Sequence, residues 1–341
     1  MNMKHLCAFV ALALASILPG LNLWAQMTDE ELAALKKRAA EEQWTFTVGE
    51  TAATKRPMTQ LCGFKDSPDW RKTAKFETIH AKKEALPSQF DWRELGGCTP
   101  VRDQGGCGSC WAFGTVAATE SAIRIADGID VDLSEQWLVS CNQSGWSCAD
   151  GGWEVFDYFL PSGGLTDYCG DSGAVLEADF PYTAADDACH CPYTHTYFVD
   201  DWAYIASQSE VASVEDIKQA IVDYGPVTVA LYVNGAFTAY TGGVFGGAGC
   251  DNQWVNHIVA LVGWDDSLGA EGAWILRNSW SEDWGIGGYM YIEYGCSMVG
   301  YRASFVRDTG QGDYWVLPSA DLGGSGPQGG PVSPASETYP L

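Results

Sequence analysis

The sequence predicts an α+β fold with two lobes, a helical lobe first and a β-rich lobe second, with the junction near residue 205. The first half is predicted to be helical because residues 109–125 carry small and apolar side chains such as Ala112 and Val116 at helical spacing, and Gly128 follows as a stop signal. The second half is predicted to be β because four apolar runs are separated by glycine-rich turns. These runs are 226–233, 257–264, 273–277 and 289–294.

Four regions are predicted along the 341 residues. Residues 1–25 are typical of a secretory signal, because Lys4 and His5 precede an apolar run that is too short to span a bilayer, and Ala25 is the expected cleavage position. The alternative is an uncleaved anchor. Residues 26–85 are predicted to be a removable prosegment and residues 86–305 the main body. Residues 306–341 form a tail, expected to be flexible from about residue 318 because it is rich in Gly, Pro and Ser.

Two further helices are predicted from local signals. Thr28 followed by Glu31 is a capping-box pattern, which predicts a helix that runs to about Glu42. In the main body, a helix is expected through residues 152–160, ending before Pro161.

The charge is strongly acidic and unevenly distributed. The chain has a formal net charge of −25, and residues from Leu86 onward carry 34 acidic and 7 basic side chains. A body this acidic argues against binding to nucleic acid or to an anionic membrane. The residues before Leu86 carry 12 basic and 10 acidic side chains. We hypothesise that charge holds this basic prosegment on the acidic body and that the contact loosens when carboxylates protonate.

The strongest chemical signal is the run from Gln104 to Phe113, Gln-Gly-Gly-Cys-Gly-Ser-Cys-Trp-Ala-Phe. Cys110 is expected where a loop enters a helix, and there the free amides and the helix dipole favour a nucleophilic thiolate with a lowered pKa. A structural role as a disulfide partner or core thiol is the alternative. Cys107 is expected to form a disulfide of its own, and a redox pair of Cys107 with Cys110 is the rival interpretation.

A histidine distant in sequence is needed as the base. The best of the five is His257, because it enters an apolar strand and lies roughly 150 residues after Cys110. Asn278 in Asn-Ser-Trp can orient the ring through its amide carbonyl, and Trp280 can shield that bond from water. The side-chain amide of Gln104 and the backbone N–H of Cys110 are expected to form an oxyanion hole. Alone, the Asn-Ser-Trp triplet is an ordinary turn and Gln104 an ordinary solvated side chain.

Together these residues resemble the papain and cathepsin family of cysteine proteases over nearly all of residues 86–305. The resemblance implies a papain-like fold with a helical lobe, a β-barrel-like lobe and the active-site cleft between them. Gln43-Trp44-Thr45-Phe46 and Leu61-Cys62-Gly63 resemble the short prosegment of the cathepsin B type. That type implies a prosegment that runs through the cleft in the reverse direction to the substrate.

The resemblance also implies a substrate site. Cys148 to Gly152 resembles the family's Cys-Asn-Gly-Gly turn with one extra residue, so Gly151 and Gly152 would pair with an extended substrate. An apolar pocket for the second residue before the cut would be lined by Trp153, Ala230, Val255, Ile258 and either Tyr301 or Ala303. The alternative is that some of these are plain core residues.

Twelve cysteines in a chain with an export signal indicate an oxidising compartment. The resemblance implies the disulfides Cys107–Cys148, Cys141–Cys189 and Cys250–Cys296. It leaves Cys98, Cys169 and Cys191, of which one should be unpaired or joined to another group.

The predicted function is a cysteine endopeptidase, made as a secreted zymogen, that needs no metal and no cofactor. An endopeptidase is favoured because the paired histidines that cap the cleft of cathepsin B, and the insertion that carries them, are missing between Asp150 and Asp179. The alternatives are an exopeptidase of the same family and a catalytically inactive binding or matrix homologue. The expected partners are peptide and protein substrates, the protein's own prosegment and cystatin-like inhibitors. A monomer is expected, secreted or in a lysosome or vacuole, or periplasmic or extracellular in a bacterium.

Overall fold

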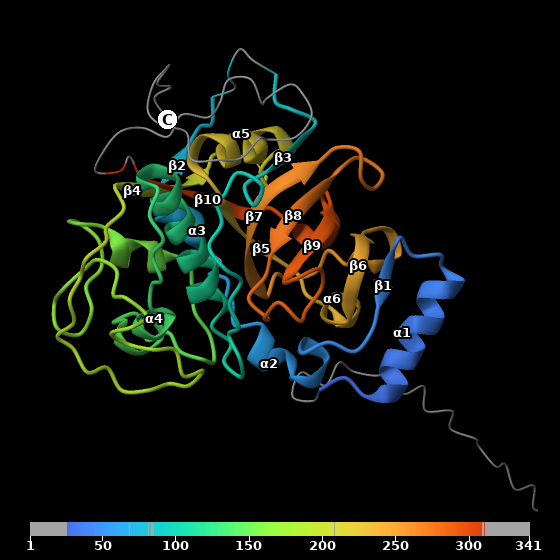
Figure 1. Ribbon diagram of the computed structural model, residues 1–341, viewed down its shortest axis with the longest axis horizontal. Helices are drawn as coiled ribbons and strands as arrows, with labels where there is room; N and C mark the ends of the chain where they lie inside the picture. Colours follow the sequence, from blue (N-terminus) through green and yellow to red (C-terminus); the bar gives the residue numbers. More distant parts are fainter. Residues whose placement is uncertain are drawn as a thin grey trace, which may run out of the picture.

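The computed structural model describes residues 26–67, 69–80, 82, 85–207, 209–308 and 310. The predicted signal, and the part of the tail expected to be flexible, lie outside these residues. Within them, helices pack beside one sheet of mixed direction (Figure 1). The strands are β1 Phe46–Val48, β2 Phe76–Glu77, β3 Gln89–Asp91, β4 Asp201–Ile205, β5 Val227–Leu231, β6 Tyr240–Phe245, β7 His257–Asp265, β8 Ala273–Arg277, β9 Tyr289–Glu293 and β10 Tyr301–Arg307.

The α-helices are α1 Asp29–Glu41, α2 Met58–Leu61, α3 Cys110–Asp127, α4 Glu135–Cys141, α5 Val214–Tyr224 and α6 Gly235–Thr238. Short 3₁₀ helices lie at Ala53–Lys55, Trp70–Lys72, Glu154–Phe159, Gly247–Gly249 and Cys296–Met298. The buried side chains form two clusters, one within the sheet lobe and one around α3 and α4. The predicted two-lobed α+β fold is therefore correct.

Helix α3 is the central element of the helical lobe, and it lies where the prediction placed it. It ends at Gly128, which takes the left-handed conformation at φ 70° that glycine tolerates best. The helix packs closely on β7, because a Cβ added at Gly114 would lie 2.5 Å from Cγ2 of Ile258. Glycine at this point therefore lets the two lobes approach each other.

Two helical predictions need correction. The helix expected through residues 152–160 is a 3₁₀ helix, Glu154–Phe159, in which Val155, Phe156, Tyr158 and Phe159 are all buried. Val155 and Tyr158 lie three positions apart, as do Phe156 and Phe159, and this apolar spacing suits an α-helix as well as a 3₁₀ helix, so the sequence does not decide between the two types. The second half is also not purely β, since α5 runs there from its N-cap Ser213 to Gly225.

The four predicted strands correspond to β5, β7, β8 and β9, which are consecutive in the sheet in the order β9-β8-β7-β5. The sheet order is β1-β6-β9-β8-β7-β5-β10-β4-β2, and β3 pairs with β7. Strands β5, β7 and β8 are buried along nearly their whole length, so β7 is a rigid mount for His257 at its first residue.

The described residues before 86 run from one edge of the sheet to the opposite edge. The predicted capping box is formed, with the Thr28 hydroxyl accepting from the Glu31 amide at the start of α1. Strand β1 then pairs with β6 at one edge of the sheet, α2 lies at the junction of the lobes, and β2 pairs with β4 at the opposite edge (Figure 1). This stretch, residues 26–85, is called the N-terminal segment below.

Four disulfides join cysteines within the part of the chain that the structure describes. Three join the pairs that the resemblance implied, and the fourth joins Cys169 to Cys191. Cys98 is the unpaired one of the three cysteines left open, and among the described residues Cys62 and Cys110 are free as well.

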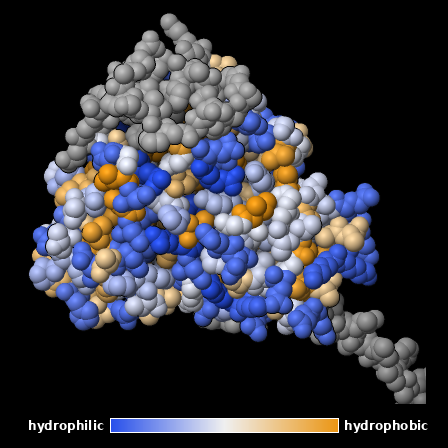
Figure 2. Space-filling model, viewed as in Figure 1, coloured by the Kyte–Doolittle hydropathy of each residue, from blue (hydrophilic) through white to orange (hydrophobic). Residues whose placement is uncertain are grey.

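None of the described helices is long and apolar enough to cross a bilayer. The face of the molecule in Figure 2 is mainly hydrophilic, with hydrophobic residues scattered among the polar ones.

Candidate active site

Cys110 is the first residue of α3 and is fully buried. The side chain of the N-cap residue, Ser109, does not cap the helix; its hydroxyl instead hydrogen-bonds the Tyr182 hydroxyl at 2.6 Å. The backbone amides of Gly63, Ile258 and Trp111 act on the Cys110 sulfur. Each lowers the pKa of the thiol and so favours a thiolate.

The pKa of Cys110 nevertheless differs from the predicted lowering. Burial is the largest influence and raises the pKa of the thiol to about 11, against the smaller effect of those amides. The N-terminal segment contributes to this burial, because Gly63 lies against the sulfur and its amide donates to Sγ at 3.3 Å. The lowered pKa expected from the sequence is therefore not found in this structure, in which the thiol is buried.

The loop before Cys110 is held independently of that thiol. The Cys107–Cys148 disulfide has a sulfur–sulfur distance of 2.01 Å, and the Gly108 amide donates to the Cys148 carbonyl at 2.9 Å. Since Cys107 is bonded to Cys148, the rival interpretation of a Cys107–Cys110 redox pair is wrong.

His257 and Asn278 meet because β7 and β8 are antiparallel neighbours and each residue lies at the corresponding end of its strand. The ring Nε2 lies 2.8 Å from Oδ1 of Asn278, and Oδ1 also accepts from the Ser279 amide at 2.8 Å. Trp280 is fully buried over the imidazole, with ring centroids 4.7 Å apart, so it excludes water from the His257–Asn278 pair.

The start of β7 reaches Cys110, since the backbone amide of Ile258, the residue after His257, favours the Cys110 thiolate. Nδ1 of His257 has no hydrogen-bond partner among the described residues and is buried. Burial lowers the pKa of His257 to about 4, although the Asn278 bond favours the protonated form. In the covered state at neutral pH the thiol and the imidazole are both uncharged.

Gln104 is oriented by a residue that the sequence analysis did not single out. The Ser279 hydroxyl donates to Oε1 of Gln104 at 2.7 Å, and the Gln104 amide donates to the Ser279 carbonyl at 2.9 Å. Nε2 of Gln104 is thereby turned toward acceptors, and it donates to the Leu61 carbonyl at 3.1 Å. The only sequence signal for this role is that Ser279 is the middle residue of the Asn-Ser-Trp triplet.

The N-terminal segment uses the surfaces expected to bind substrate. Gly151 donates to the Gly63 carbonyl at 2.9 Å and accepts from the Lys65 amide at 3.0 Å, which makes a parallel bridge with Phe64. Gly152 is buried next to it.

Phe64 packs in the cluster that contains the predicted pocket residues, with its ring edge-on to Trp153 at 5.5 Å. The residues of that cluster expected to line the pocket are Trp153, Ala230, Val255, Ile258 and Tyr301. Ala303, the other possibility for the last position, belongs to the core cluster of the sheet lobe.

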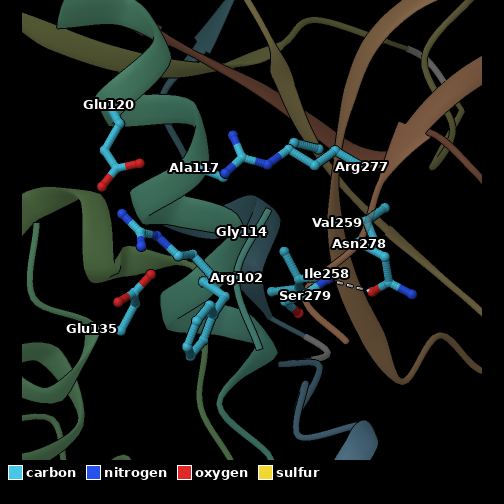
Figure 3. A pocket seen from close by; sticks show the side chains of 12 residues that line it. Arg102, Gly114, Ala117, Glu120, Glu135, Ile258, Val259, Arg277, Asn278 and Ser279 are labelled. Atoms are coloured by element: carbon cyan, nitrogen blue, oxygen red, sulfur yellow. Dashed lines mark hydrogen bonds between the residues drawn. The ribbon is translucent and has the colours of Figure 1, made fainter. Parts of the chain in front are cut away.

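A buried charged cluster lies behind the site, between α3 and the strands β7 and β8 (Figure 3). Glu120 accepts from the Thr99 hydroxyl at 2.6 Å, and Arg277 donates to the same hydroxyl at 3.1 Å. Burial raises the pKa of Glu120 and, more strongly, that of Glu135. Because Arg277 directly precedes Asn278, this network fixes the end of β8 from behind.

Comparison with known proteins gives one family. The model of the papain family cysteine proteases matches residues 86–307. Mouse pro-cathepsin H is 37% identical over 223 residues, covering 64% of this chain and 63% of that protein. Digestive cysteine proteinase 2 of the lobster Homarus americanus is 34% identical over 227 residues, covering 64% and 66%. The chain thus spans just under two thirds of the length of these relatives.

Among solved structures, digestive procathepsin L2 from the larval midgut of Tenebrio molitor superposes with a TM-score of 0.70 and 27% identity, over 82% of this chain and 89% of that one. The proform of the ragweed pollen allergen Amb a 11 superposes with a TM-score of 0.66 and 26% identity, over 81% and 86%. Both matches extend beyond residues 86–307 into the N-terminal segment, since those residues alone are too few to make up such a share.

Proposed function

The chain belongs to the papain family of cysteine proteases, and on that premise we propose that it hydrolyses peptide bonds with Cys110 as nucleophile and His257 as its base. The observation that carries the proposal is the constellation at the lobe junction. A free thiol at the N-terminus of α3 is reached by the start of β7, whose first residue carries an imidazole that Asn278 orients and Trp280 covers. This is the arrangement that nucleophilic catalysis by a thiol requires.

The reaction is an acyl transfer to water. His257 takes the proton of the Cys110 thiol, the thiolate attacks the peptide carbonyl, and the oxyanion accepts hydrogen bonds from Nε2 of Gln104 and the Cys110 amide. His257 gives its proton to the leaving amine, and a thioester remains on Cys110. A water that loses its proton to His257 then hydrolyses the thioester. The role of Gln104 as an oxyanion donor is supported by its bond to the Leu61 carbonyl, because its Nε2 already donates to a carbonyl oxygen at this site.

We infer that the N-terminal segment is the inhibitory prosegment of a secreted zymogen. Along the chain, the segment reaches Gln104 with Leu61, the sulfur with Gly63 and the apolar pocket with Phe64. A substrate would enter the pocket with the second residue before the cut and reach the sulfur afterwards. The segment therefore runs opposite to a substrate, as the cathepsin B resemblance implies, and it places the Gly63 amide at the Cys110 sulfur.

Charge contributes to holding the segment. Arg56 binds Asp103 of the body through two hydrogen bonds of 2.7 and 2.8 Å, and Lys65 and Lys82 pair with body carboxylates as well. Burial raises the pKa of Asp103, but the hydrogen bonds from Arg56 and the Gly105 amide outweigh it and leave the pKa lowered. A carboxylate with a lowered pKa stabilises the closed state above its unperturbed pKa, and this contribution is lost as the pH falls.

This charge contact predicts a pH-dependent effect of Arg56→Gln on processing. At pH 7 the variant precursor is expected to process itself several-fold faster than the wild type, and the two rates are expected to converge as the pH falls below the lowered pKa of Asp103, where the carboxylate is protonated. The readout is the rate of conversion to the mature form on gels. Lys37→Gln is the control, because Lys37 pairs only with Glu41 of its own helix. Equal rates at pH 7 would show that the Arg56–Asp103 pair does not hold the segment.

The substrate preference is proposed from the pocket. Phe64 occupies it among apolar side chains, so an apolar or aromatic residue is expected at the second position before the cut.

Endopeptidase action is supported by His195, which is held in its own loop. Its Nδ1 bonds the Gly173 carbonyl at 2.7 Å, and Nε2 lies 3.6 Å from the Asp167 carboxylate, so it is not free to anchor a substrate terminus.

The test uses the processed protein with two fluorogenic peptides. One is blocked at both ends with Phe in the second position before the cut, and the other is a dipeptide substrate with a free amino terminus. The blocked peptide is expected to be cleaved with the higher kcat/KM, and a thiol-reactive peptide epoxide is expected to stop cleavage by labelling Cys110. Preference for the free terminus would favour the exopeptidase. No cleavage and no labelling would favour an inactive homologue that binds other proteins.

Secretion, or delivery to a lysosome, vacuole or periplasm, belongs to the same proposal and is supported by the four disulfides. Cystatin-like inhibitors and a monomeric state are likewise proposed on the family resemblance.

A further inference from the structure

Arg302 is a cation buried at the edge of the proposed substrate pocket. Its side chain is 1% exposed. The residue lies in β10 directly after Tyr301, at the place where the pairing of β10 with β5 shifts register. Its φ of 52° is in the left-handed region, which is uncommon for a side chain of this size. An irregularity of this kind re-aims a side chain, and here it aims a guanidinium.

Among the described residues, the side-chain partners of Arg302 all come from the N-terminal segment. The guanidinium pairs with the Asp66 carboxylate and donates to the Ser67 carbonyl at 2.9 Å. It also stacks over Trp70 at 4.3 Å and lies 5.5 Å from the ring of Phe64. The Asp66 carboxylate accepts a second bond from the Tyr301 hydroxyl at 2.8 Å.

Removal of the segment changes this environment completely. The carboxylate, the carbonyl and both rings leave together, and the same step empties the pocket that Phe64 occupied. The guanidinium then loses its anionic partner and its carbonyl acceptor, and a substrate carboxylate can take their place. The processed site therefore has an apolar pocket with an unpaired cation and the Tyr301 hydroxyl at its edge.

We propose that Arg302 and Tyr301 make the processed protein accept a glutamate side chain at the second residue before the cut, its carboxylate replacing that of Asp66. This rests on the proposed protease function. Glutamate is the acidic residue with the longer reach, so from the pocket that the Phe64 ring fills, 5.5 Å from the guanidinium, its carboxylate can extend to the position of the Asp66 carboxylate. The pocket is then dual, taking an aromatic ring or a carboxylate.

The acidic body opposes this preference only at long range. The 34 acidic side chains after Leu86 repel an acidic peptide in solution, but this repulsion is screened beyond a Debye length of about 8–10 Å. A charge-assisted hydrogen bond in a pocket sheltered from water acts at contact distance and is screened far less. At the pocket the local cation therefore outweighs the general charge.

The test compares blocked peptides that are identical except for Glu, Gln or Phe at the second position before the cut. With wild-type processed protein, kcat/KM is expected to be on the order of 10-fold higher for Glu than for Gln. In Arg302→Gln the Glu-to-Gln ratio is expected to fall to about 1. Arg307→Gln is the matched control. It removes the same charge from the same strand, and Arg307 also pairs with the segment, through Glu77, but at the far end of β10. Its ratio is expected to match that of wild type.

The Phe peptide separates the two levels of the proposal. Cleavage of the Phe peptide with a Glu-to-Gln ratio of 1 or less in wild type would overturn the role of Arg302 and leave the protease function standing. Failure to cleave any of the three peptides would overturn the protease function itself.

A second measurement needs no variant and therefore does not depend on Arg302→Gln folding. In wild type the Glu-to-Gln ratio is expected to approach 1 below the pKa of the substrate glutamate, about 4.3, and to decrease in 1 M salt. Both peptides are measured under each condition, so the pH profile of the protein cancels in the ratio. A ratio that stays high when the glutamate is protonated would exclude an ion pair with Arg302.

Discussion

Replacement of Cys110 by alanine is expected to abolish peptide hydrolysis by the processed protein, lowering kcat/KM by on the order of 10⁴-fold or more. The reason is that the acyl-enzyme route needs a sulfur at this helix N-terminus, and no second thiol is placed to replace it. Cys98 is free, but burial raises its pKa to about 12, so it does not form a thiolate at neutral pH. The measurement is kcat/KM on the blocked Phe peptide, with circular dichroism to verify the fold.

Cys98→Ala is the matched control, since it removes one free thiol of the same chain. Its kcat/KM is expected to stay within about twofold of wild type, and the peptide epoxide is expected to label Cys98→Ala but not Cys110→Ala. Undiminished hydrolysis by Cys110→Ala would contradict the assignment of the nucleophile, and with it the whole thiol mechanism.

Replacement of Gly63 by alanine is expected to open the precursor without any cleavage of the chain. A Cβ at Gly63 would lie 1.6 Å from the carbonyl oxygen of Gly108, which is backbone and cannot rotate away. The segment must therefore leave the sulfur, and burial no longer raises the pKa of Cys110. The uncleaved precursor is expected to react with the peptide epoxide at pH 7 about 100-fold faster than wild type or more. The measurement is the intact mass of the labelled protein over time.

Gly49→Ala is the control for this experiment, because it adds the same methyl group to the same segment. Its Cβ would meet only a side-chain methyl of Thr241, at 3.1 Å. Labelling of this precursor is expected to remain slow. If Gly63→Ala were as unreactive as wild type, the segment would not be the element that protects Cys110.

The residues of the candidate site were predictable where short local motifs identify them. Cys110 at a helix start and His257 at a strand start were placed by short-range patterns, and the structure brings the imidazole to Asn278 at 2.8 Å. The role of Ser279 in orienting Gln104 was not predictable, because a hydroxyl in a turn carries no signal until the second loop is in place.

The fold was likewise predictable where the signal is local and not where it depends on contacts between distant segments. The strands β7 and β8 are predictable because their apolar runs are continuous and bounded by turns, whereas the type of the helix Glu154–Phe159 is not, because apolar residues three positions apart suit an α-helix as well as a 3₁₀ helix. The Cys169–Cys191 disulfide was left open, since pairing depends on where loops meet in space and not on spacing along the chain.

By itself, the sequence determined the reactive groups and the two-lobed arrangement, because helix starts, strand periodicity and nucleophile motifs are properties of neighbouring residues. Only the tertiary structure decided the state of those groups. It buries the Cys110 thiol under Gly63, so that the pKa of the thiol rises to about 11 instead of falling, and it gives Arg302 an acidic partner in Asp66, more than two hundred positions earlier in the chain. The physical reason is that burial and charge pairing depend on which surfaces meet, and a linear pattern does not contain that information.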